Sequence, residues 1–126
     1  MPTIARIIWT VGFLIGTITH SLDLYHGGWL PYDFRPLPWN LYWTSLTFLD
    51  PLAAVLIWVR VPKVEGIGVW LGVAIMASNV LVNGFTAFIA GYEEFYFSLA
   101  LQSVFAAFVF FAAWEHWRGK ERQEKQ

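Results

Sequence analysis

Four long apolar segments make up most of this chain, and they restrict it to one class of structure. Each is about as long as the ~20 residues that a helix needs to cross a bilayer. Runs such as IIWTVGFLIGTIT and SVFAAFVFFAAW are apolar all round, whereas a helix of a soluble bundle has a charged face opposite its apolar stripe. The sequence therefore predicts an all-α integral membrane protein with membrane-spanning helices at about 4–25, 39–60, 67–90 and 95–117.

The composition supports this class and excludes several others. The chain is 57% hydrophobic and only 13% charged, which is more apolar than an ordinary soluble domain. Its net charge of −1 gives no reason to expect a nucleic-acid partner. The absence of cysteine excludes disulfides, thiolate metal ligands and cysteine nucleophiles. The chain also lacks GxSxG, P-loop, GxGxxG and HExxH motifs, so we expect no cofactor and no metal.

The basic residues are distributed unevenly once the chain is threaded back and forth across a membrane. Arg35 falls on one side, and the other seven of the eight fall together on the opposite side: Arg6, Arg60, Lys63, Arg118, Lys120, Arg122 and Lys125. Lys and Arg near helix ends are retained in the cytoplasm, so we expect both termini there. No small-x-small cleavage site follows the first segment, so we expect it to be kept. The short loops and the lack of organelle signals favour a bacterial inner membrane.

The connections predict how the helices are arranged. The one long connection, 26–38, contains three prolines and several aromatic residues, which is typical of an outer interfacial loop. VPKVEG and GYEEF are tight turns that make successive helices antiparallel neighbours. We therefore expect a single-domain antiparallel four-helix bundle, with a cytoplasmic tail at 118–126.

Small residues occur four apart on two of the segments, as the pairs Gly12 with Gly16 and Gly68 with Gly72. Such pairs let helices approach each other closely. We expect them to pack within the bundle. The alternative is an interface in a homodimer or a larger membrane complex.

Asp50 is the most informative polar residue, because polar groups at membrane depth are costly. It lies close to the membrane midplane and precedes Pro51, which leaves the carbonyl of Thr47 without its usual partner. An ionised carboxylate there costs at least ~2.5 kcal/mol, so it should be protonated, paired or hydrated. We favour a ligand or proton site that includes Asp50 and Thr47. The alternative is a neutral Asp50 that serves as interhelical glue by bonding to Thr47, Asn79 or Asn83.

Each of the other segments also carries polar groups in its outer half. His20 and Asp23 are three residues apart on one helix face and could exchange protons. A metal site that also uses His26 has little support, because it offers few nitrogen ligands and no sulfur. The remaining candidates are the amides Asn79, Asn83 and Gln102. Together these groups predict a polar vestibule that opens outward and narrows towards Asp50.

The stretch DLYHGGWLPYDFRPLPWNLYWTSLTFLDPLAAVLIW resembles short uncharacterised bacterial membrane proteins with four helices, a likeness that implies no activity. In topology the chain is also similar to the emopamil-binding and sigma-two receptor superfamily. That resemblance implies four helices, a long outer connection after the first, and buried acids that pair with amines or act on sterols. Asp23 and Asp50 resemble its acidic pair in placement. The second segment lacks the glutamate of that superfamily, and the loop lacks its acidic pattern.

These observations favour a membrane protein without enzymatic activity that binds a lipophilic or cationic small molecule in the vestibule and could couple binding to protons. One alternative is a non-catalytic accessory or assembly subunit of a membrane complex. Another is an emopamil-binding-like sterol or isoprenoid isomerase, in which His20 or Asp23 moves protons and Asp50 stabilises a carbocation. A pore is a fourth alternative and would need an oligomer. In every case the chain has membrane lipid as a partner.

Overall fold

The structure is a computed structural model that describes all 126 residues. It is all-helical and contains no strand. The four long helices are α1 (Thr3–Gly27), α2 (Leu37–Leu56), α3 (Pro62–Gly84) and α4 (Tyr96–Glu124). A π-helical turn, η1 (Phe85–Ile89), continues α3, and a 3-10 turn, η2 (Glu93–Phe95), precedes α4.

Three helical stretches are long and apolar enough to cross a membrane: Thr3–Gly27, Pro62–Ile89 and Glu93–Glu124. The prediction of long apolar helices that could cross a membrane is confirmed for these three. α2 is not among them. It is the shortest of the long helices, with 20 residues, and carries Asn40, Thr44 and Asp50. All three of these polar side chains are buried, so α2 turns them towards the other helices.

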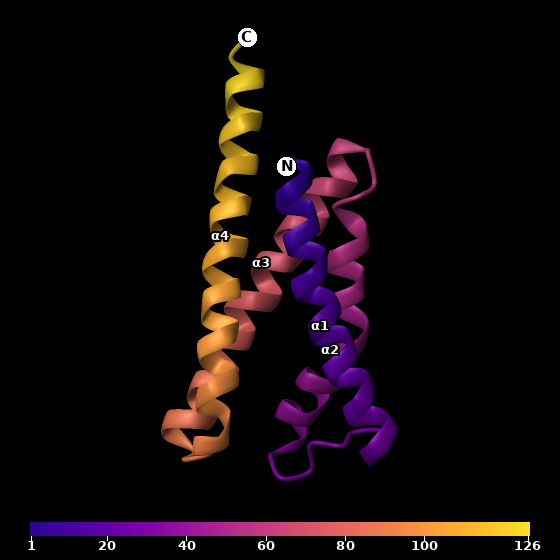
Figure 1. The fold of residues 1–126 in the computed structure, drawn as a ribbon, viewed down its shortest axis with the longest axis vertical. Helices are drawn as coiled ribbons and strands as arrows, with labels where there is room; N and C mark the ends of the chain where they lie inside the picture. Colours follow the sequence, from indigo (N-terminus) through magenta and orange to yellow (C-terminus); the bar gives the residue numbers. More distant parts are fainter.

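The helices pack in chain order. α1 lies against α2, α2 against α3, and α3 against α4, whereas α1 and α4 touch only sparsely. Figure 1 shows α3 crossing obliquely between the α1–α2 pair and α4. Both chain termini lie at the same end of the molecule, the upper end in Figure 1. We call this the termini end. The opposite end, formed by residues 28–36 and 90–95, is the loop end.

Several predicted boundaries differ from the structure. The second segment ends at Leu56 rather than at residue 60, and the third begins at Pro62 rather than at residue 67. Pro62 lies in the first turn of α3, where its missing N–H costs nothing and its fixed φ suits a helix. α4 continues to Glu124, so most of the predicted tail 118–126 is helical. The first helix ends where Gly28 adopts φ 76°, as the glycines after His26 predict.

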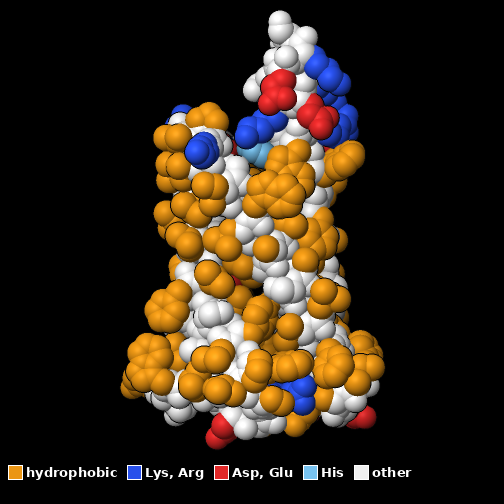
Figure 2. Space-filling model, turned by 180° about the vertical axis from the view of Figure 1, so that it is seen from behind, with side chains coloured by type: hydrophobic (Ala, Val, Ile, Leu, Met, Phe, Trp, Pro, Cys, Tyr) orange, Lys and Arg blue, Asp and Glu red, His pale blue; other side chains and the backbone are white.

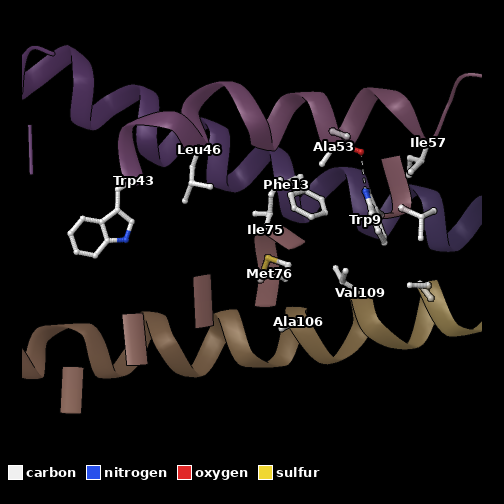
Figure 3. Close-up of a cluster of buried hydrophobic side chains, with 14 residues drawn as sticks. Trp9, Phe13, Trp43, Leu46, Ala53, Ile57, Ile75, Met76, Ala106 and Val109 are labelled. Atoms are coloured by element: carbon white, nitrogen blue, oxygen red, sulfur yellow. Dashed lines mark hydrogen bonds between the residues drawn. The ribbon is translucent and has the colours of Figure 1, made fainter. Parts of the chain in front are cut away.

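The apolar core lies mainly in the half of the bundle nearer the termini end (Figure 3). Trp9 is completely buried, and its indole N–H donates to the carbonyl of Ala53 at 3.1 Å. Its ring packs against Phe13 with 5.3 Å between centroids. This half therefore joins α1 to the other helices mainly by apolar packing, as the apolar inner segments predict.

The four paired glycines all face other helices of the same chain. A side chain added at Gly12 would collide with Phe105, and one at Gly16 with the carboxyl of Asp50. At Gly68 it would meet Leu56 Cβ at 2.7 Å, and at Gly72 it would collide with the ring of Trp9. Their prediction as packing residues within the bundle is confirmed, and these positions are not free to form a dimer interface.

Charged side chains gather at the two ends of the molecule, with a wide hydrophobic belt between them (Figure 2). At the termini end one carboxylate, Glu65, joins three helices. It lies 2.9 Å from an Arg6 nitrogen of α1, 3.5 Å from the amine of Met1 and 3.6 Å from His116 Nδ1 of α4. The ion pairs of Glu65 with Arg6 and Met1 join α3 to the N-terminal end of α1, and His116 of α4 lies beside the same carboxylate.

Candidate functional site

A cavity of about 920 Å³ occupies the half of the bundle nearer the loop end. All four long helices and the 28–36 loop contribute to its wall. Its apolar and aromatic lining consists of Phe13, Ile15, Pro31, Tyr32, Phe34, Trp43, Met76, Phe95, Leu101 and Phe105. Towards the termini end it is bounded by Phe105, whose ring packs edge-on against Phe13 at 5.2 Å. Most of its wall can therefore accept a hydrocarbon.

Six of the seven residues predicted to form a site line this single cavity: Asp50, His20, Asp23, Asn79, Asn83 and Gln102. The seventh, Thr47, does not line it, and its buried hydroxyl oxygen has no hydrogen-bond partner. The six come from four helices, so only tertiary packing brings them together.

Asp50 lies in the cavity wall with only 4% of its surface exposed. One carboxyl oxygen, Oδ1, is buried without any hydrogen-bond partner, and the other, Oδ2, faces Gly16 of α1. Asp50 makes no hydrogen bond to Thr47, Asn79 or Asn83. The interpretation of Asp50 as interhelical glue is therefore wrong. The fold buries this carboxyl beside a cavity and leaves it with unused hydrogen-bonding capacity.

The amides form a network across three helices. Asn83 of α3 accepts a hydrogen bond from the indole N–H of Trp43 on α2 at 2.8 Å. Its own amide donates to Asn79 at 2.8 Å and to Gln102 on α4 at 2.6 Å. Asn83 thereby uses both of its N–H groups and its carbonyl oxygen within the protein. The network holds α4 at a defined position relative to α2 and α3 along one wall of the cavity.

A second polar cluster forms at the loop end, where Tyr32 joins the two predicted groups of α1. The Tyr32 hydroxyl donates to Asp23 Oδ2 at 2.6 Å, and its oxygen lies 2.8 Å from His20 Nδ1. The hydroxyl proton is used on Asp23, so Nδ1 of His20 carries a proton and donates to Tyr32. In a neutral imidazole, Nε2 then remains as an acceptor. Burial and the bond to Asp23 raise the pKa of the Tyr32 phenol above its ordinary value, which keeps it protonated.

Asn40 positions the loop that carries Tyr32. Its side-chain N–H donates to the carbonyl of Leu30 at 2.9 Å, and its oxygen accepts the backbone N–H of Tyr32 at 3.0 Å. These two bonds hold the chain at Leu30, where φ is 55°. The sequence identified neither Asn40 nor Tyr32 as a functional residue. In the sequence, Asn40 stands where a helix is expected to start, which gives it no functional signal. Tyr32 lies in an irregular loop, which has no periodicity that would place it against α1.

Aromatic rings tie the loop to the start of α4. Phe34 packs against Trp43 at 5.9 Å, Tyr92 at 5.5 Å and Phe95 at 6.2 Å between centroids. The hydroxyl of Tyr92 also donates to the carbonyl of Phe34 at 3.2 Å. Three of these rings line the cavity: Phe34, Trp43 and Phe95. They form its wall between α2 and α4 at the loop end.

The ionisable groups of the lining are carboxyl groups and histidines, without a permanent cation. Asp50 and Asp23 are in the wall with His20 and His26, and no Lys or Arg lines the cavity. No group of three or more His, Asp or Glu side chains comes together with metal-binding geometry. The arrangement of His20, Asp23 and His26 considered as a metal site is therefore not formed. The wall can attract a cation or donate and accept hydrogen bonds, but it offers an anion no cationic side chain except a protonated histidine.

Comparisons with protein-family models, curated proteins and solved structures found no significant match.

Proposed function

We propose that this protein binds a lipophilic ligand with a cationic or hydrogen-bonding head group in the cavity. The carrying observation is Asp50, a buried carboxyl without a hydrogen-bond partner in the wall of a cavity of about 920 Å³. Ionisable groups at membrane depth are costly and are retained mainly for function. A bound cation or donor would supply the partner that the protein does not, and the surrounding aromatic rings suit both cations and hydrocarbon.

The proposal includes a membrane topology. We place all four helices across the membrane as an antiparallel bundle in a bacterial inner membrane, with both termini in the cytoplasm. At about 1.5 Å per residue, the 20 residues of α2 extend about 30 Å, which matches a bilayer core. The excess of Lys and Arg at the termini end supports a cytoplasmic location for that end. The cavity then lies in the outer half of the membrane.

Proton movement is part of the same proposal. The cluster of His20, Tyr32 and Asp23 lies at the loop end of the cavity, and Asp50 lies in its wall further towards the termini end. A histidine that is hydrogen-bonded to a tyrosine can take up or release a proton as the occupant of the cavity changes. Binding and protonation would then be linked.

The test is binding of radiolabelled tetraphenylphosphonium, a lipophilic cation, to the protein in nanodiscs. We expect Asp50→Asn to weaken binding by about tenfold or more, which corresponds to about 1.4 kcal/mol. The matched control is Glu93→Gln, the same acid-to-amide change at an exposed residue of the loop end, and it should leave binding unchanged. Equal binding by the wild type and both variants would reject the proposal.

A sterol or isoprenoid isomerase is a second candidate. The observation in its favour is the cavity volume of about 920 Å³, well above the ~300 Å³ at the lower end of ligand pockets. His20 with Tyr32 and Asp23 would provide the proton-transfer group. Incubation with a sterol in deuterated buffer tests it: incorporation of deuterium that Tyr32→Phe and His20→Gln abolish would establish catalysis, and no incorporation would exclude it.

A further inference from the structure

The cavity wall includes side chains that also belong to the outer surface of the bundle. Ile15 of α1 and Leu101 of α4 both line the cavity, yet they are 59% and 57% exposed. The two helices meet at Gly12 and Phe105, where a side chain on the glycine would collide with the phenylalanine ring. From that contact towards the loop end, α1 and α4 separate (Figure 1). We call the part of the cavity wall that is formed by these two exposed side chains, Ile15 and Leu101, the seam.

The position of the seam determines what lies outside it. α1 and α4 are two of the helices long and apolar enough to cross a membrane, so their exposed apolar side chains face lipid chains. An opening between them therefore joins the cavity to the hydrocarbon interior of the bilayer, and a lipid could enter through it without passing through water.

The cavity is also elongated. Its lining on α1 runs from Gly12 to Gly27, a length of roughly 22 Å at 1.5 Å per residue. That is most of the ~30 Å thickness of a bilayer core. A space of this elongated shape suits a chain-like molecule better than a compact one.

The charges of the wall select among lipid head groups. The two carboxyl groups in the lining, Asp23 and Asp50, are not offset by any Lys or Arg there. A fatty acid or a phosphate-bearing head would bring a negative charge into a wall that already holds Asp23 and offers no Lys or Arg as a counter-charge. A hydroxyl can bond to Asp50, and an ammonium group can pair with it.

From these observations, and resting on the proposed function, we propose that the seam admits a single-chain lipid from the bilayer, with a head that is uncharged or cationic and carries no phosphate. The head lies at Asp50, close to the seam at Ile15. The chain, having entered through the seam, lies along the cavity towards Phe34 and Phe95. The ligand class of the cavity is thus a long-chain alcohol or amine.

The experiment uses photolabelling in nanodiscs with diazirine analogues of hexadecanol, hexadecylamine and palmitate at equal mole fractions. We expect the alcohol and the amine to label cavity residues about tenfold more than palmitate does. Ile15→Trp and Leu101→Trp narrow the seam and should each reduce this labelling by about tenfold. The controls are Ile18→Trp and Val104→Trp, at positions that are 60% and 72% exposed and lie outside the cavity lining; they should label like the wild type.

The outcomes separate this inference from the proposed function. Equal labelling by all three probes, or seam variants that label like their controls, would overturn the inference. If tetraphenylphosphonium binding still depended on Asp50, the proposed function would stand. Loss of the Asp50 dependence would reject the proposed function itself. Size-exclusion elution and helical circular dichroism of each variant verify that the fold is retained, because all four substitutions are at lipid-facing positions.

Discussion

Replacing Asp50 by alanine is expected to stabilise the protein in the absence of ligand. Truncation of a buried polar residue usually destabilises a protein, because the hydrogen bonds of that residue are lost. Asp50 makes no hydrogen bond, and its Oδ1 is buried without a partner. The substitution therefore removes a desolvation cost and breaks no polar contact. Proteins often retain such destabilising groups where function needs them.

The magnitude follows from the environment of the carboxyl. A buried polar group without a partner costs about 1–3 kcal/mol, and alanine is also the better helix former by about 0.5 kcal/mol. The contact between Oδ2 and Gly16 is lost, but the vacated space joins a cavity that already exists. We expect Asp50→Ala to raise the free energy of unfolding by about 1–2 kcal/mol. If Asp50 were interhelical glue with two bonds, the same change would lower it by about 1.2 kcal/mol, since such bonds average ~0.6 kcal/mol each.

The assay is reversible unfolding in mixed micelles by titration with dodecyl sulfate, followed by tryptophan fluorescence and circular dichroism. Asn83→Ala is the comparison, because Asn83 makes interhelical bonds to Trp43 and Gln102. The free energy of unfolding of Asn83→Ala should be about 1.2 kcal/mol lower than that of the wild type. The two variants are therefore expected to shift stability in opposite directions. A fall of about 1 kcal/mol or more in the free energy of unfolding of Asp50→Ala, close to the value expected for Asn83→Ala, would refute the reasoning.

Two further predictions concern packing and pH. Gly72→Ala should destabilise the protein by about 1–3 kcal/mol because the added methyl group collides with the ring of Trp9. The control is Gly84→Ala, which should not destabilise the protein because nothing lies within 4 Å of the added methyl group. Dodecyl sulfate titration of both variants measures the difference. The raised pKa of Tyr32 means that the unfolded chain loses this proton near pH 10 while the folded protein keeps it. The stabilisation that protonated Tyr32 gives to the fold is therefore fully present below about pH 10 and is lost as the pH rises further. Tyr32→Phe should reduce the fall in stability above that pH, and it should also increase hydrogen exchange in the loop, because the bond to Asp23 is gone; an unchanged alkaline profile would contradict the assignment.

The helices were predictable to different degrees, for a physical reason. Apolar runs as long as a bilayer is thick leave few alternatives to helix, because every backbone group must be satisfied within the segment. The ends of the runs are less informative. The structure ends α2 at Leu56 and begins α3 at Pro62, although the apolar residues Ile57, Val59 and Val61 lie between these two ends. Helix capping and tertiary contacts set those limits, as where the backbone of Ile57 accepts a bond from Arg6.

The site was predictable as a set of residues but not as a geometry. Asp50, His20 and Asn83 stand out because they are polar where the surroundings are apolar. Asn40 and Trp43 carry no such signal. Asn40 is a clamp only because the loop folds back over it, and Trp43 matters because its N–H reaches an amide on another helix.

The amino-acid sequence alone establishes a helical membrane protein, the rough extent of its segments and the polar residues that need an explanation, because hydrophobicity and length are local properties. Tertiary packing alone determines that six of those residues from four helices line one cavity, that Asp50 has no partner within the chain, and that α1 and α4 part towards the loop end. These features depend on how helix faces meet. Side chains distant in the sequence, such as Phe105 against Gly12 and Trp9 against Gly72, set those contacts.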